Sequence, residues 1–574
     1  MLRRWYQARH NAYPDWEEVL EQGKDLWEAA QTQTQRGPRV LLSTAIGSYV
    51  HAVTLESALA AALRLRGAEP HVLLCDAELA ACAECDASLY PRVERFVAHG
   101  PSRDLCRDCY WPARRVYERL GVRVHRLSAL VTDDQRQTAA AVARSVPFAD
   151  IPTYQHDGLV VGEHAYAGAL RFFASGSLDD EPQAEAVLRR YLQAALVTMF
   201  ATRRLAREQG FTCAVFTHGI YIPWGVMGEV CRQEGVRIAN WNVAYRKRRF
   251  IFSHGETYHH TLMSEPQAAW ESLDLRPARE QTLMDYLASR REGMFDWIVF
   301  HRPAARAEPR ELAGALGLDP SRPVIGLLTN VSWDAQLHYP ANAFPDMLEW
   351  ITRTCEYFAA RPDLQLLIRV HPAELNGFPP SRQPVLAEMT RRLPALAPNI
   401  TVVPPESRMS TYSLMSLCNA AIIYGTKMGV ELTSVGLPVI VAGEAWVRNK
   451  GLTRDASTPE EYFRILDGLP FAARPDETLL RRARTYAYHF FFRRMIPLSF
   501  VQPRAGYPIY VLRLDKIERL LPGATPGLDV ICDGILTGAP FVYDEDTPTP
   551  QVTGAGARRQ NPVSHGSMSP REDV

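Results

Sequence analysis

The sequence lacks any uninterrupted run of about 18 apolar residues, the length that a membrane-spanning helix requires. It also lacks an excess of charge, because 64 Lys and Arg residues balance 64 Asp and Glu residues. A protein that coats nucleic acid through bulk charge would be strongly basic. Residues 1–6 carry neither the apolar stretch nor the small-residue cleavage site of a signal peptide. We therefore expect a cytoplasmic protein without a nucleic-acid partner; peripheral membrane association and oligomeric state stay open.

Cysteine is scarce, with 10 residues among 574, which is too few for a scaffold held together by disulfides. Half of the cysteines lie within 75–109, where Cys82 and Cys85 form one CxxC pair and Cys106 and Cys109 form another. Two such pairs are typical of a zinc-ribbon site, in which four thiolates hold one Zn²⁺. An iron–sulfur cluster and uncoordinated or redox-active thiols are the alternatives. We expect structural zinc, because four thiolates leave no open coordination position for catalysis.

Strand-like and helical segments alternate through the first half of the chain. Residues 39–42 and 71–75 have the composition of buried strands, and the helical pattern between them completes a βαβ unit. Such a unit implies parallel strands joined by a right-handed crossover. The same alternation returns with the apolar runs 213–216 and 236–240. This half is therefore predicted to be one α/β domain.

A second α/β series follows a polar, helical and proline-punctuated stretch. Its predicted strands are 324–329, 364–370, 400–403, 420–424 and 438–441. Two successive series are typical of two doubly wound, Rossmann-like domains that face each other across a cleft.

The predicted fold class is accordingly α/β, with a tail whose Pro, Gly, Ser, Thr and charge content indicates disorder. The predicted order is an N-terminal helix (1–36), a first Rossmann-like domain on the acceptor side (37–265) with a Cys-rich insertion (75–110), a helical connection (266–322), a second Rossmann-like domain on the donor side (323–475), a C-terminal helical region (476–543) and the tail (544–574).

Polar or glycine-rich turns follow three of the predicted strands in the second domain. Tyr424, Gly425 and Thr426 end one strand and begin a helix, whose free N–H groups suit a phosphate. Glu431 lies about one turn further on, where it could accept hydrogen bonds from sugar or ribose hydroxyls. An ordinary strand–helix–strand unit with a tight glycine turn is the alternative.

Asn330 follows a second of these strands, and Arg369 and His371 follow a third. Arg and His side chains can together neutralise a phosphate, although a lone loop histidine is more often structural or exposed. Because ligands bind outside the carboxyl ends of strands in open α/β sheets, these three strand ends predict a single crevice.

The segment from Glu431 to Ile440, with Gly436 and Pro438 between them, resembles the donor-binding segment of two-Rossmann (GT-B) glycosyltransferases. In retaining members two Glu lie eight residues apart, and Glu431 corresponds to the second of them. The earlier position is Ile423 here, so the stereochemical outcome stays open.

A wider set of segments resembles bacterial capsular polysaccharide biosynthesis proteins, a grouping that includes Kdo transferases. These segments are 329–334, 369–374, 424–426 and 451–453. The resemblance implies a glycosyltransferase that moves a sugar from a CMP- or UDP-linked donor to a glycan or small-molecule acceptor, in surface polysaccharide biosynthesis and without NAD. It also implies that His371, Thr426 and Glu431 serve the donor.

Two other functions fit the same sequence. One is a GT-B-fold binding or regulatory protein without turnover, in line with Ile423. The other is a different two-Rossmann enzyme, such as a sugar epimerase or a glycerophosphotransferase.

Glycosyl transfer needs a base for the acceptor hydroxyl, and the first domain offers His218 and Glu256 as catalytic candidates. His218 follows a predicted strand, and Glu256 lies close to His254. A structural or solvated histidine is the alternative for His218. The basic run 246–249 is either a solvated face or a contact for an anionic ligand. Other polar residues near strand ends are Ser43, Thr44, His51, Asp76, Asn242 and Tyr245.

Overall fold

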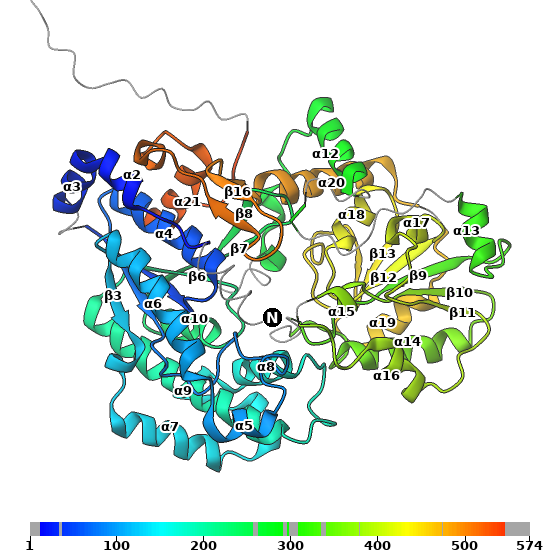
Figure 1. The fold of residues 1–574 in the computed structure, drawn as a ribbon. Coiled ribbons are helices and arrows are strands. Elements are labelled where there is room, and N and C mark those ends of the chain that lie inside the picture. Colours follow the sequence, from blue (N-terminus) through cyan, green and yellow to red (C-terminus); the bar gives the residue numbers. More distant parts are fainter. Residues whose placement is uncertain are drawn as a thin grey trace, which may run out of the picture.

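The protein folds into two α/β domains, each built around a largely parallel sheet, and the domains face each other (Figure 1). This confirms the predicted fold class. The computed structural model describes residues 12–33, 37–255, 262–290, 296–297, 308–334, 340–377, 379–472 and 474–545.

The first domain contains a seven-stranded sheet. Its strands are β1 (Arg39–Ala45), β2 (Glu69–Leu74), β3 (Arg123–Arg126), β6 (Cys213–Thr217), β7 (Arg237–Val243), β8 (Arg249–His254) and β15 (Ile496–Pro497). The order is β15-β8-β7-β6-β1-β2-β3, and the strands from β7 to β3 are parallel. β8 and β15 extend one edge in antiparallel fashion.

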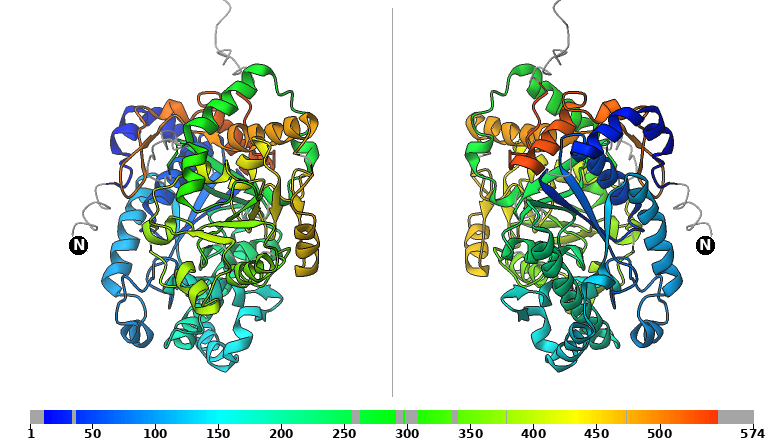
Figure 2. Two further views of the ribbon diagram at one scale, coloured as in Figure 1. Left: turned by 90° about the vertical axis from the view of Figure 1, so that its right-hand side faces the viewer. Right: turned by 90° about the vertical axis from the view of Figure 1, so that its left-hand side faces the viewer.

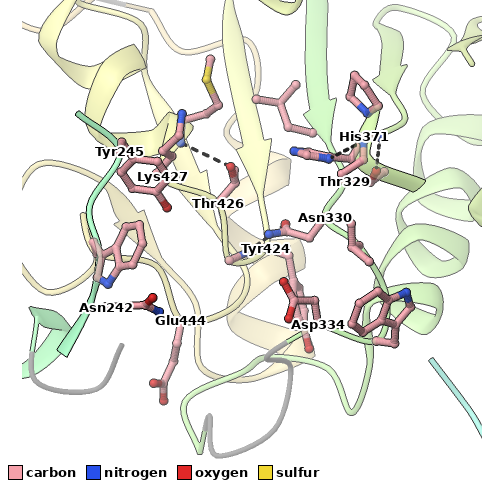
Figure 3. Close-up of a pocket in the computed structure, with 18 of the residues that line it drawn as sticks. Asn242, Tyr245, Thr329, Asn330, Asp334, His371, Tyr424, Thr426, Lys427 and Glu444 are labelled. Carbon is pink, nitrogen blue, oxygen red and sulfur yellow. Dashed lines mark hydrogen bonds between the residues drawn. The ribbon is translucent and has the colours of Figure 1, made fainter. Parts of the chain in front are cut away.

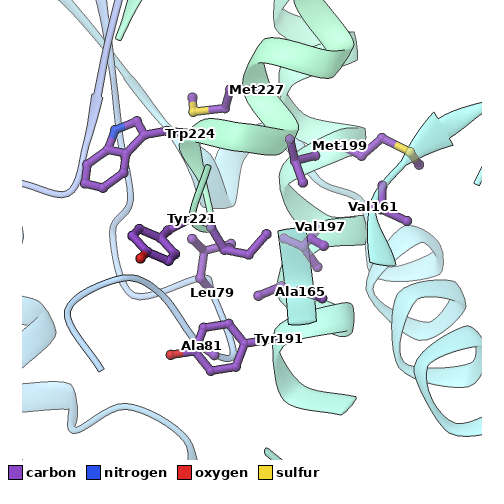
Figure 4. Close-up of a cluster of buried hydrophobic side chains, with 14 of the residues drawn as sticks. Leu79, Ala81, Val161, Ala165, Tyr191, Val197, Met199, Tyr221, Trp224 and Met227 are labelled. Atoms are coloured by element: carbon purple, nitrogen blue, oxygen red, sulfur yellow. The ribbon is translucent and has the colours of Figure 1, made fainter. Parts of the chain in front are cut away.

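Alternating side chains of these strands enter two separate cores, one on each face of the sheet. Leu41 and Leu73 pack in the core drawn in Figure 4, whereas Val40, Leu42 and Val72 pack in the other. This is the two-residue periodicity of a strand that is covered on both faces, which explains the nearly continuous apolar runs. The core of Figure 4 is closed by α7 (Asp133–Ser145), α8 (Gly162–Phe173), α9 (Ala184–Gln209) and α10 (Trp224–Gln233). The opposite core is closed by α4 (Val50–Arg64), α6 (Arg103–Arg119) and α21 (Pro526–Thr537).

The second domain contains a six-stranded, wholly parallel sheet in the order β11-β10-β9-β12-β13-β14. Its strands are β9 (Val324–Leu328), β10 (Gln365–Arg369), β11 (Ile400–Val403), β12 (Ala420–Ile423), β13 (Val439–Val441) and β14 (Arg454–Asp455). The five predicted strands are present, and two-residue β14 was too short to show a pattern. One face carries α14 (Met347–Ala359), α16 (Val385–Arg392) and α19 (Pro459–Asp467). The other carries α12 (Pro277–Arg290), α17 (Thr411–Met415), α18 (Met428–Ser434) and α20 (Glu477–Tyr488).

The chain returns to the first domain after α20, so that α21 lies beside α4 (Figure 1), close to the blue N-terminal helices in the right-hand view of Figure 2. A π-helical turn (His489–Arg493) leads into β15, which pairs with β8, and then into α21. β16 (Val501–Pro503) and β17 (Tyr510–Leu512) lie between β15 and α21 in the chain. The C-terminal region that was predicted to be helical therefore also contains short strands. Strands of two or three residues give no readable alternation in a sequence.

Shorter elements complete the described chain: α2 (Glu17–Gln22), α3 (Lys24–Gln33), α5 (Val93–His99), α13 (Pro309–Ala315), α15 (Ala373–Asn376), β4 (Gln155–His156) and β5 (Leu159–Val160). The single N-terminal helix that we predicted is thus two helices, α2 and α3, within the described part. The predicted disordered tail lies almost entirely outside the described residues, which end at 545. Within the described ranges, no helix is both long enough and apolar enough to cross a membrane.

Candidate functional site

A cavity of about 540 Å³ lies between the two domains and is lined by residues from the carboxyl ends of both sheets. In the first sheet the neighbours β1 and β6 lead into α4 and α10, which cover opposite faces. In the second sheet β9 and β12 lead into α14 and α18, which also cover opposite faces. Connections that diverge in this way leave a crevice at the strand ends, where open α/β sheets bind ligands.

Asn330, Gly425 and Thr426 meet at the crevice between β9 and β12 (Figure 3). The Asn330 Oδ1 accepts a hydrogen bond from the Gly425 N–H at 3.4 Å, which ties the two strand ends together. A Cβ atom at Gly425 would lie 3.2 Å from the Glu444 carbonyl oxygen, so the turn favours glycine. Thr426 Oγ1 accepts a hydrogen bond from the Met428 N–H at 3.3 Å, and α18 begins at Met428, two residues later than predicted.

His371 lies beside them at the end of β10. Its backbone N–H donates to Thr329 Oγ1 at 3.0 Å, and its Nδ1 accepts from the Ala373 N–H at 3.1 Å. Burial, together with the charges of Lys427 and Arg369, lowers the pKa of His371 to about 4. The ring is therefore neutral at pH 7 with its proton on Nε2, so that atom is a hydrogen-bond donor.

Lys427 lines the same crevice and is held by a buried ion network. Its Nζ lies 2.8 Å from Glu431 Oε1 and 4.9 Å from the centroid of the Tyr245 ring, which belongs to the first domain (Figure 3). The other Glu431 oxygen accepts from Arg290 Nε at 3.1 Å and from the Tyr412 hydroxyl at 2.7 Å. Burial by itself would raise the pKa of Glu431, but Arg290 and Lys427 lower it to about 2. Both carboxylate oxygens are thus engaged, and Glu431 fixes Lys427 and Arg290 at the cleft wall.

Arg369 and Tyr424 also line the cavity, but their polar ends bond to the protein. Arg369 donates to the carbonyl oxygens of Pro404 and Ser407, which anchors the loop after β11. The Tyr424 hydroxyl donates to the Phe344 carbonyl oxygen at 2.8 Å, inside the core. These two predicted binding residues therefore shape the crevice.

His218 lies on the opposite wall, directly after β6, in a left-handed backbone conformation (φ 65°). Its ring centroid is 4.8 Å from that of Tyr221, whose hydroxyl donates to Asp334 Oδ1 of the second domain at 2.8 Å. Burial lowers the pKa of His218 to about 4. The ring is neutral at pH 7, the form that can take a proton. Glu256, the other catalytic candidate, lies outside the described residues.

The basic run after β7 is divided, because Lys247 and Arg248 are exposed whereas Arg246 and Arg249 pack internally. Arg246 lies 4.0 Å from the centroid of the Phe492 ring and donates to the Phe491 carbonyl oxygen at 3.1 Å. Arg249 donates to the Met495 carbonyl oxygen at 3.2 Å. These arginines hold the returning C-terminal segment against the first domain.

The predicted zinc site is not supported. Within the described residues, no group of three or more His, Cys, Asp or Glu side chains is arranged to hold a metal ion. The Sγ atoms of Cys82 and Cys85 lie 3.9 Å apart in a loop, and Cys106 and Cys109 lie one turn apart on α6, where both thiols interact electrostatically with that of Cys82. The Cys109 Sγ accepts a hydrogen bond from the Ser48 N–H at 3.2 Å, and burial raises the pKa of this thiol to about 11. The second CxxC is thus part of a helix packed on the domain.

Lys427, Glu444 and Arg171 are among the cleft residues that were not selected as candidates from the sequence. Lys427 directly follows the candidate Thr426, so the position of Thr426 at the predicted helix start could have indicated it. Glu444 follows β13, and its Oε1 accepts from the Ala341 N–H at 2.8 Å. Arg171, on α8, has no sequence signal, because it resembles any polar residue of an amphipathic helix.

No protein-family model matches this chain, and no curated protein matches it. Among solved structures it is similar to the β-Kdo 2,4 transferase of Thermosulfurimonas dismutans KpsC, with a TM-score of 0.31 and 16% identity over 48% of this chain and 80% of that one. The β-Kdo 2,7 transferase of KpsC gives a TM-score of 0.31 and 12% identity over 56% and 88%. A UDP-GlcNAc 2-epimerase of Methanocaldococcus jannaschii, in complex with UDP-GlcNAc and UDP, gives a TM-score of 0.26 and 8% identity over 78% of this chain and 99% of that one.

These solved structures include glycosyltransferases, as the resemblance predicted. At such TM-scores and identities the similarity says nothing about the reaction. The two-domain architecture rests on the strand order and the cleft of this chain itself.

Proposed function

We propose that the protein is a glycosyltransferase that moves a sugar from a nucleotide-sugar donor to a glycan or small-molecule acceptor. The observation that carries the proposal is the meeting of His371, Thr426 and Lys427 at the crevice between β9 and β12. An Nε2–H, a hydroxyl and an ammonium group are all donors suited to phosphate oxygens. The donor nucleotide accordingly belongs on the second domain, and the acceptor on the first.

The chemistry assigns a role to each wall. The bond between the sugar anomeric carbon and the donor phosphate breaks with its electron pair going to the phosphate, where Lys427 and His371 stabilise the charge. The acceptor hydroxyl forms the new bond and gives its proton to a base, for which neutral His218 on the facing wall is the candidate. Glu256 remains the second candidate for this base.

The donor is proposed to be CMP- or UDP-linked, and the product a surface polysaccharide of the capsule type made in the cytoplasm. Support for this finer proposal comes from the sequence segments that resemble capsular polysaccharide biosynthesis proteins. Glu431 supports the donor site through Lys427, whose position it fixes.

The test is a thermal-shift panel of CMP, UDP, GDP and dTDP with their sugars, followed by nucleotide release without acceptor. We expect one nucleotide family to raise the melting temperature and its sugar to release nucleotide slowly. His371→Ala should abolish release, whereas His99→Ala, an exposed control on α5, should not change it. Conversion of a UDP-sugar to its epimer would instead identify an epimerase, and binding without turnover in the presence of acceptors would identify a binding protein.

A further inference from the structure

Among the described residues, Arg171, Arg290, Arg369 and Lys427 are the Lys and Arg side chains that line the cleft. Arg290 and Lys427 form ion pairs with Glu431. Arg369 donates to two backbone carbonyl groups. These three cations therefore have acceptors in the protein, although the Nε of Arg369, like the Nη1 of Arg171, has no hydrogen-bond partner among the described residues.

Arg171 lies in the last turn of α8, on the first-domain wall of the cleft. Its guanidinium carbon is 5.5 Å from the centroid of the Tyr221 ring. The charge of Glu84 acts on Arg171, but its buried Nη1 has no hydrogen-bond partner within the described parts of the chain. A buried donor without an acceptor is unfavourable, so this arrangement persists at a cost to stability unless a ligand supplies the acceptor.

The surroundings hold the guanidinium in position. Tyr221 is held by the hydrogen bond that its hydroxyl donates to Asp334 and by the contact of its ring with the His218 ring. A planar guanidinium stacked on a fixed ring presents its N–H groups in the geometry that carboxylates and phosphates accept. A carboxylate or phosphate on a ligand would supply both an acceptor for Nη1 and a charge opposite to that of Arg171.

We propose that Arg171 forms an anion subsite for the acceptor, so that the acceptor is a sugar or glycan carrying a carboxylate or phosphate. This rests on the proposed function, because it assigns the first-domain wall to the acceptor. Arg171 and Tyr221 belong to the same wall as His218, and Lys427 and His371 to the other. The anion is thus separate from the donor phosphate.

The experiment is calorimetry with the full chain in the presence of the nucleotide that stabilises it most. The probes are methyl β-D-glucuronide, glucose 6-phosphate and the neutral methyl β-D-glucoside. The wild type should bind at least one anionic sugar about tenfold more tightly than the glucoside, which is the effect of one charge-assisted contact. Arg171→Gln should lose this preference and Arg171→Lys should keep part of it. Arg115→Gln, an exposed control on α6, should keep all of it.

Equal or undetectable binding of all three sugars, or a preference that survives in Arg171→Gln, would overturn the subsite. The melting temperature separates binding from structure: loss of an unpartnered buried cation should not lower it, and a large fall in both variants would show a structural role. The glucuronide and the sugar phosphate distinguish the two anions. Failure of every nucleotide to bind, with the anionic preference intact, would refute the proposed function and not the subsite.

Discussion

His371 and His218 face the cleft from opposite domains, and both are neutral at pH 7 because burial lowers the pKa of each to about 4. For His371 the backbone then decides the tautomer, since the Ala373 N–H occupies Nδ1. A neutral donor recognises a phosphate without adding a second full charge beside Lys427. Titration of these rings should leave activity unchanged above about pH 5.

Replacement of the His371 ring separates its hydrogen bond from its bulk. His371→Gln keeps an N–H donor near the Nε2 position and should retain part of the nucleotide affinity, whereas His371→Leu should lose about 1.5–3 kcal/mol, the range for a hydrogen bond to a charged group. Calorimetry with the stabilising nucleotide measures both. Equal losses in the two variants would show that shape, and not the donor, matters.

Replacement of Glu431 should mainly lower the free energy of unfolding. It should affect nucleotide binding only indirectly, through the position of Lys427. Glu431→Gln leaves Lys427 and Arg290 buried with one fewer anion, which should cost about 3–5 kcal/mol of unfolding free energy. The double variant Glu431→Gln with Lys427→Met should recover part of that loss, because it removes the unpaired cation. Urea unfolding measures the stability, and calorimetry the nucleotide affinity. A single variant as stable as the wild type that binds nucleotide less tightly by about 1–3 kcal/mol would instead show that Glu431 contacts the ligand.

At the scale of elements, the edge of the first sheet contains a buried histidine pair between β2 and β3. The His71 Nδ1 and the His125 Nε2 lie 2.9 Å apart, and Glu69 lies 3.2 Å from the other His71 nitrogen. Burial, together with the charges of His71 and Arg123, lowers the pKa of His125 to about 4. Protonation of both rings would place two N–H donors in contact, so the pair requires at least one neutral ring.

This pair makes stability depend on pH with a defined sign. The folded-state pKa of His125 lies below its unfolded value of about 6.5, so the unfolded chain binds more protons between the two values. The contribution of His125 is therefore fully present above about pH 6.5 and lost as the pH falls towards 4, with a slope of at most about 1.4 kcal/mol per pH unit. Urea unfolding from pH 7.5 to 4.5 should show a smaller slope for His125→Asn than for the wild type. The exposed control His99→Asn should behave as the wild type, and an unchanged slope in His125→Asn would contradict the assignment.

On the scale of the whole molecule, the C-terminal segment joins the domains a second time. α20 packs on the second domain, whereas β15 and α21 complete the first. Across the cleft, Tyr221 bonds to Asp334, and Gln383 accepts from the Gly176 N–H at 2.9 Å. The walls of the cleft are therefore positioned by contacts between distant parts of the chain.

Truncation tests this arrangement. A chain that ends at 494 loses β15 and α21, whose Leu528, Ile531 and Ile535 are fully buried in the first domain. The exposed apolar core should make the first domain molten, with strong dye binding and loss of near-UV circular dichroism. A chain that ends at 545 keeps all the helices and strands given above and should melt as the full chain does. A cooperative, nucleotide-responsive melt in the shorter chain would refute the role of the returning segment.

Much of the fold was predictable because local periodicity reports burial. An apolar run such as 324–328 is typical of a strand covered on both faces, and parallel strands bring their carboxyl ends to one edge. That reasoning brought Asn330, Gly425 and His371 together in the prediction, and the structure places them around one cavity. The short strands β14 to β17 have too few residues to carry such a signal.

The sequence by itself determined which segments are buried and which strand ends carry polar groups, because both follow from residues that are neighbours in the chain. Only the tertiary structure decided which buried polar groups pair. Glu431 meets Arg290 from 141 positions away, so it fixes a wall where the pattern predicted a ligand contact. Arg171 is distinguished by its place on the cleft wall together with a buried Nη1 that has no partner among the described residues. Which buried polar side chains pair depends on which surfaces come into contact as the chain folds. The local periodicity of the sequence does not report contacts between distant segments.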